Sequence, residues 1–117
     1  IMEYLKKIQE SERYLHNAED VLEKAGRENG YYKDVKYVKS ACGIAYLAAL
    51  LAADAFLAKH NQKVPDKKGR RHADNYRELL TKLNKKALNS FNAAYYGLHI
   101  DGYYGSVLKC KNHSGLL

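Results

Sequence analysis

The sequence contains no tryptophan and a single proline, Pro65, among its 117 residues, together with eight glycines. A chain with so few breakers is unlike loop-rich or all-β proteins and favours helices. Cysteine is also scarce, since only Cys42 and Cys110 are present. Two cysteines in such positions do not form a disulfide framework, and no secretory signal precedes the first predicted helix. We therefore expect a cytoplasmic protein.

Acidic residues are few in one segment, and this unbalances the charge. The net charge is +7, and residues 59–86 hold ten Lys/Arg against three Asp/Glu. Residues 1–58 hold eight against nine, so this half is almost neutral. A concentrated positive segment indicates a surface for phosphates or nucleic acid, but it is equally typical of a solvated loop and helix face.

The most apolar stretch lies in the middle of the chain, where residues 41–58 read ACGIAYLAALLAADAFLA with Asp54 as the one charged residue. This stretch predicts a central helix from about Val35 to His60 that other helices cover on nearly every side. Its length is close to that of the shortest membrane spans. The alanine content, the charge of Asp54 and the amphipathic segments on both sides argue against a span. We expect no membrane association.

A seven-residue repeat predicts the first helix over residues 1–25. Its two seam positions are occupied by Ile1, Ile8, Leu15 and Leu22, and by Tyr4, Ser11, Ala18 and Ala25. Gly26 and Gly30 then end this helix, and the second helix is expected to begin within residues 31–34. Two long antiparallel helices follow from this spacing.

Residues 61–72, which read NQKVPDKKGRRH, form the one clear connection. A third helix follows, with Asn75 at its N-cap and a glutamate three residues later as in a capping box. A fourth helix is expected from about Ala87. The pattern predicts an all-α fold, an antiparallel bundle of four or five helices with the two long helices first. We expect a single domain over residues 1–105 and a C-terminal tail at 106–117.

Four short stretches mark the boundaries of these elements: Tyr31-Tyr32-Lys33-Asp34, Ala52-Ala53-Asp54-Ala55-Phe56-Leu57, Pro65, and His72-Ala73-Asp74-Asn75-Tyr76-Arg77-Glu78-Leu79-Leu80. In this order they resemble the HEPN superfamily. Its members are small all-α bundles associated with nucleotidyltransferases, toxin–antitoxin pairs and RNA processing. The chain is also similar in pattern to an uncharacterised small bacterial helical-bundle family with the same topology.

Ribonuclease members of the HEPN superfamily carry an Arg followed a few residues later by a His near the final helices. Here Arg70, Arg71 and Arg77 have no His at that spacing, and His99 has no Arg within reach before it. The resemblance therefore implies a non-nuclease, binding-type member, and such bundles are usually dimers. We expect a homodimer without catalytic residues or a cofactor.

Candidate ligand- or nucleic-acid-binding residues lie in the basic segment. They are Lys63, Lys67, Lys68, Arg70, Arg71, His72, Tyr76 and Arg77. The cations would contact phosphates, and the ring of Tyr76 or His72 would stack on a base. The alternative is a solvated loop followed by a soluble helix face.

Asp54 is the one carboxylate in the central apolar run. One interpretation is a buried acid in a functional cleft, where Asp54, Tyr95, Tyr96 and His99 form a candidate pocket. The other is a structural carboxylate bonded to a tyrosine hydroxyl or to a cation from another helix, because an unpaired buried charge is costly. The C-terminal tyrosines are also typical of a dimer interface that is partly dry and partly wet.

Metal binding has little support, because Cys110 and His113 have the spacing of half a site and no second pair completes it.

Two hypotheses for function follow from the sequence. The first is a non-catalytic binding or accessory module that contacts nucleic acid or a nucleotide through the basic surface of residues 63–86. The second is a protein-interaction or structural homodimer module with no nucleic-acid role.

Overall fold

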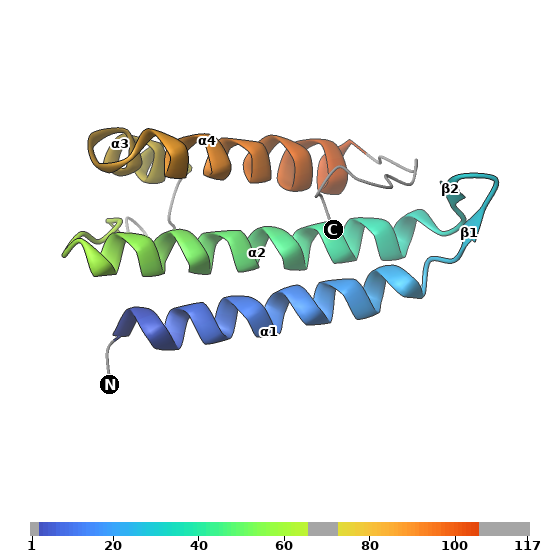
Figure 1. Cartoon of the computed structure of the whole chain (residues 1–117). Helices are drawn as coiled ribbons and strands as arrows, with labels where there is room; N and C mark the ends of the chain where they lie inside the picture. The colour runs from blue at the N-terminus through green and yellow to red at the C-terminus, as the bar shows by residue number, and fades with distance from the viewer. Residues whose placement is uncertain (1–2, 66–72, 106–117) are drawn as a thin grey trace.

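Four α-helices, a two-stranded hairpin and a π-helix make up the computed structural model, which describes residues 3–65 and 73–105 (Figure 1). The elements are α1 (Glu3–Glu23), β1 (Arg27–Glu28), β2 (Tyr31–Tyr32), α2 (Val35–Lys59), α3 (Ala73–Leu83), α4 (Lys85–Ala94) and η1 (Tyr95–Tyr104). Figure 1 shows α2 between α1 on one side and α3 and α4 on the other. The predicted all-α bundle with its two long helices first is confirmed.

The pairing of α1 with α2 depends on small residues. Ala18 and Ala41 are fully buried, and Ser11 Oγ donates a hydrogen bond of 2.7 Å to the carbonyl oxygen of Ala48. Side chains of this size let the two backbones approach closely, so that even a backbone carbonyl of α2 is reached from α1. The predicted seam position shared by Ser11 and Ala18 therefore faces α2.

The other seam position meets α2 only near the end of α1. Leu22 is buried, but Ile8 and Leu15 are exposed, while Ile1 lies outside the described residues. A straight α-helix has 3.6 residues per turn, so a strict seven-residue repeat drifts around its surface by about 20° per repeat. The drift leaves Ile8 and Leu15 beside the contact with α2 and not within it.

A hairpin joins α1 to α2, which the sequence analysis did not predict. Strands β1 and β2 pair antiparallel, with Arg27 opposite Tyr32 and Glu28 opposite Tyr31. Asn29 and Gly30 between them both have positive φ, at 53° and 82°. Asn-Gly with this backbone is the preferred two-residue hairpin turn, because its twist matches that of the strands. The second helix begins at Val35, directly after the hairpin and the residues 31–34 within which its start was expected.

Asparagine and aspartate side chains begin two of the helices. Asp34 caps α2 by accepting a hydrogen bond of 3.0 Å from the backbone nitrogen of Lys36. Asn84 caps α4 in the same way, accepting from the nitrogen of Ala87, so α4 begins at Lys85, two residues before the expected start. The predicted cap at Asn75 was wrong, because α3 already includes Ala73.

Two core clusters share α2. The first joins α1, α2 and η1 around Ala18, Ala41 and Tyr46, and the second joins α2, α3 and α4 around Leu57 and Leu80. Among the described residues, α2 is the one helix that is long and apolar enough to cross a membrane by length and composition, and half of its most apolar window is buried within the bundle. The core helix of a helical bundle passes the same test.

Candidate interaction surface

One face of α2 contains no buried residue. We define the α2 strip as Ser40, Gly43, Ile44, Leu47, Leu51 and Asp54, which recur three or four residues apart and so share one side of the helix. Leu47, in the middle of the strip, is 47% exposed. The expectation that other helices cover α2 on nearly every side was therefore wrong for this side. The other faces of α2 carry its buried residues.

Two hollows lie along the α2 strip. The larger, of about 600 Å³, is lined by Ser40, Gly43, Ile44, Tyr46, Leu47, His99 and Tyr103. The smaller, of about 270 Å³, is lined by Glu3, Lys7, Asp54, Leu57, Ala58, Gln62 and Lys63. The strip is thus bordered by η1 at one end and by the start of α1 at the other. Its centre is aliphatic and its ends are polar.

Aromatic rings form the border that η1 contributes. His99 stacks on Tyr46 of α2 with ring centroids 4.3 Å apart, and it lies nearly parallel to Tyr103 at 6.3 Å. Tyr95 meets Tyr46 edge-on at 6.0 Å. These rings lie together because His99 and Tyr103 follow Tyr95 at intervals of four residues along η1. A π-helix is rare and is often found at functional sites, which makes this border a candidate for recognition.

Burial keeps this aromatic border uncharged. It lowers the pKa of His99. Burial, with a smaller contribution from Tyr95, raises the pKa of Tyr46 to about 12. Because burial disfavours the charged form of each group, both rings are neutral near pH 7. The border therefore presents apolar ring faces with polar edges.

Asp54 is held by a tyrosine of another helix. Tyr76 of α3 is 1% exposed, and its hydroxyl donates a hydrogen bond of 2.8 Å to Asp54 Oδ1. This arrangement matches the structural interpretation of Asp54, in which the carboxylate is bonded to a tyrosine hydroxyl from another helix. Of the candidate pocket, Tyr95, Tyr96 and His99 lie together. Asp54 is not with them, because it lines a different hollow from His99. The burial of Tyr76 also leaves its ring no face for stacking on a base.

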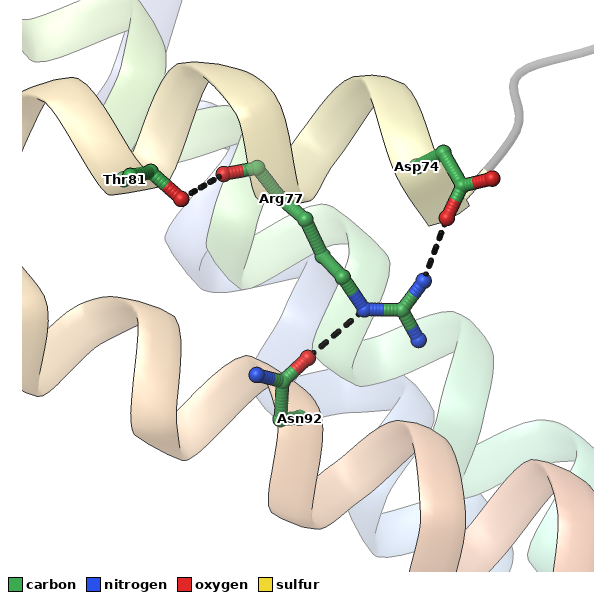
Figure 2. A network of polar contacts seen from close by, with 4 residues as sticks. All are labelled: Asp74, Arg77, Thr81 and Asn92. Carbon is green, nitrogen blue, oxygen red and sulfur yellow. Dashed lines mark hydrogen bonds and ion pairs between the residues drawn. The ribbon is translucent and has the colours of Figure 1, made fainter.

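Arg77 ties α3 to α4 and η1 (Figure 2). Its Nε donates to Asn92 Oδ1 at 2.7 Å, and its Nη1 lies 2.8 Å from Asp74 Oδ1. The guanidinium also lies over the ring of Tyr95, with Cζ 4.3 Å from the centroid. Nη2 is buried and has no hydrogen-bond partner among the described residues, which fits a position against aromatic rings. Arg77 is therefore a structural cation with a side chain only 22% exposed.

The rest of the basic segment is described in part. Lys67, Lys68, Arg70, Arg71 and His72 lie outside the described residues. Lys63 is exposed and lines the smaller hollow. Exposed lysines also occur where α3 meets α4, at Lys82, Lys85 and Lys86. In residues 3–65 and 73–105, no group of three or more His, Cys, Asp or Glu side chains is placed to hold a metal ion, and Cys110 and His113 lie beyond these ranges.

The fold and this surface define a small helical-bundle protein whose central helix has one face without a buried residue. The model of the family described as domain of unknown function (DUF5618) matches residues 6–116, and the chain belongs to this family. The structure is similar to that of a protein of unknown function from Dyadobacter fermentans, with a TM-score of 0.75 and 35% identity. That match covers 96% of this chain and 82% of the other. No curated protein matches.

These matches bear on the two resemblances in the sequence. They establish a helical-bundle family of unknown function, as the second resemblance expected. The HEPN resemblance stays a prediction. The α2 strip itself was missed by sequence reasoning, although its signal was present. Residues 41–58 are apolar all round, and such a helix needs cover on more sides than one small bundle supplies.

Proposed function

We propose that this protein is a non-catalytic helical-bundle module that binds another protein through the α2 strip. The observation that carries the proposal is the exposure of Leu47 at the centre of the most apolar helix. Scattered exposed leucines are normal on soluble proteins, but a continuous apolar strip with polar ends is typical of an interaction site. Here Ile44, Leu47 and Leu51 are continuous along one face of α2.

The chemistry of the border favours a protein as the ligand. Tyrosines and an uncharged histidine flank aliphatic side chains in the larger hollow. Aromatic residues with one polar edge are enriched in protein–protein interfaces, whereas charged residues are depleted at their cores. A phosphate-bearing ligand would need cations, and none line this hollow.

The resemblance to the HEPN superfamily agrees with this proposal. A HEPN-like bundle without the Arg-to-His spacing would be a binding-type member, and such members are usually dimers. The proposal includes that assignment together with a cytoplasmic location, as expected from the two cysteines. Cys42, the one within the described residues, is free and buried.

A photo-reactive benzoylphenylalanine at position 47 tests the proposal in cells. We expect a covalent adduct with a protein after irradiation, because Leu47 would lie inside the interface. Leu15 is the matched control, since it is similarly exposed on α1 and lines neither hollow. Equal adduct formation at the two positions, or none at either, would contradict a specific surface on α2.

Nucleic-acid or nucleotide binding through the basic surface of residues 63–86 is the second candidate. The observation that favours it is the group of exposed lysines at the α3–α4 junction, Lys82, Lys85 and Lys86, together with the concentration of the +7 net charge in residues 59–86. Such a surface would contact phosphates without reading bases, because Tyr76 is buried.

Replacing Lys85 and Lys86 with glutamate tests this candidate. If the surface binds single-stranded RNA, the affinity falls with salt, and each lost phosphate contact reduces the slope of log K against log salt by about 0.7. We expect the slope to fall by roughly 1.4 for the double variant. Replacing the exposed Lys6 and Lys24 on or beside α1 is the control and should leave the slope unchanged. No binding by the wild type at low salt would remove the candidate.

A further inference from the structure

We infer that the α2 strip docks against the α2 strip of a second copy of this chain, with the two helices antiparallel and the two Leu47 side chains meeting on a two-fold axis. The inference rests on the proposed function, which makes the strip a protein contact surface, and it names the partner. Closed two-fold dimers are the commonest homo-oligomers, and they bury the same patch of both copies.

The position of Leu47 satisfies what such an axis requires. Leu47 is the midpoint of α2, which spans Val35–Lys59, and it is the most exposed large hydrophobic residue of that helix. When two antiparallel helices cross a two-fold axis, the residue on the axis faces its own copy, and residues equally far on either side face one another. Ser40 then faces Asp54 of the second copy, and Gly43 faces Leu51.

The facing residues complement one another in size and polarity. Gly43 has no side chain, and the ring of Tyr103 lies where its Cβ would be, so Leu51 of the second copy would pack against that ring. The Ser40 hydroxyl can donate a hydrogen bond to the carboxylate of Asp54, because a carboxylate oxygen can accept more than one. Lys36, exposed one turn before Ser40, brings a positive charge toward the same carboxylate.

The charge distribution selects the antiparallel orientation. Lys59 at the end of α2 and Lys63 just after it are both exposed. Parallel helices would place these lysines of the two copies side by side. Antiparallel helices that cross at Leu47 separate the two copies of Lys59 by roughly 36 Å, which is several times the screening length of about 8 Å in physiological salt.

The area available matches what a stable dimer needs. The face is about 37 Å long. With the adjoining surfaces of α1 and η1 included, the contact is about 20 Å wide and covers roughly 700 Å² per copy, close to the roughly 800 Å² per partner of an ordinary specific interface. A second copy of α2 with its own borders therefore fills the surface.

Cysteine cross-linking at two positions of the strip tests the register. In a Cys110→Ser background, Leu47→Cys should form a disulfide-linked dimer under mild oxidation, because the two copies of residue 47 meet. Ser40→Cys is the matched control on the same exposed face. The two copies of residue 40 would lie about 21 Å apart along the helix direction. This is well beyond the roughly 7 Å between Cα atoms that a disulfide can bridge.

A third variant covers the case in which cross-linking reports only transient encounters. Leu47→Glu should weaken self-association at least 100-fold in sedimentation equilibrium while its helical circular dichroism is unchanged, because position 47 is exposed in the single chain. A wild-type monomer at micromolar concentration would overturn the inference, and so would equal cross-linking of Ser40→Cys and Leu47→Cys. An adduct at position 47 with a different protein, from a wild-type monomer, would overturn the inference and leave the proposed function standing. The absence of any adduct at position 47 would contradict both the inference and the proposed function.

Discussion

Replacing Leu57 with alanine should lower the free energy of unfolding by about 2–5 kcal/mol. Leu57 is 1% exposed and packs in the cluster that joins α2 to α3 and α4. The variant loses the transfer free energy of the removed carbons and also leaves a cavity that the surrounding helices fill only in part. Thermal denaturation followed by circular dichroism should show a midpoint lower by roughly 4 °C per kcal/mol.

Leu15→Ala is the matched control for this loss of stability. Leu15 is 43% exposed on α1, so the same three carbons are removed without opening a cavity. We expect a change within about 0.5 kcal/mol, as for most surface substitutions. A loss at Leu15 as large as that at Leu57 would mean that the bundle packs a different face of α1 from the one described.

Gly102→Ala should destabilise the protein by about 1–3 kcal/mol through overpacking. A Cβ at this position would lie 2.5 Å from Cys42 Sγ and 2.9 Å from Cys42 Cβ. Real carbon atoms do not approach this closely, so η1 would have to move away from α2. Urea denaturation of the variant and the wild type measures the difference, with the slope of the transition expected to stay the same.

A double-mutant cycle identifies the contact responsible. Cys42→Ala removes the sulfur atom that the new methyl group would meet, so Gly102→Ala should cost less in that background. Gly43→Ala is a milder control, because its Cβ would meet only the Tyr103 ring, at 3.3 Å. If the cost of Gly102→Ala is the same with and without Cys42→Ala, the approach of η1 to α2 is not where the structure has it.

The helices could be predicted because their patterns are local. A seven-residue repeat, an apolar run of about five turns and Gly26 after the first helix indicate two long helices whatever they pack against. The hairpin could also have been predicted, since Asn29-Gly30 is the strongest short turn signal. It was missed because Gly30 was interpreted, together with Gly26, as the end of the first helix, a role that glycine also serves.

The caps show where local patterns are ambiguous. Asn75 and Asn84 both precede stretches of helical character, but only the side chain of Asn84 is a cap in the structure. Asn75 lies within α3 because the helix continues back to at least Ala73. An asparagine favours an N-cap wherever a helix begins, and the sequence alone does not say where that is.

Asp54 and His99 show the same limit for candidate sites. The sequence indicated that a carboxylate within an apolar run needs a partner, but a hydroxyl, a cation or a second catalytic group would all have satisfied it. The partner is Tyr76, which lies on another helix and reaches Asp54 only through the packing of α3 on α2. His99, for its part, stacks on Tyr46 and lines a different hollow from Asp54.

The sequence by itself determined that the chain is helical, that α1 and α2 are long and adjacent, and that α2 is apolar on all sides, because these properties depend on residues a few positions apart. Only the tertiary structure decided which sides of α2 are covered. Covering a helix depends on how many neighbours reach it and from which directions, and those neighbours come from distant parts of the chain. The exposed centre of α2 at Leu47 follows from that arrangement, as do the partner of Asp54 and the aromatic border of η1.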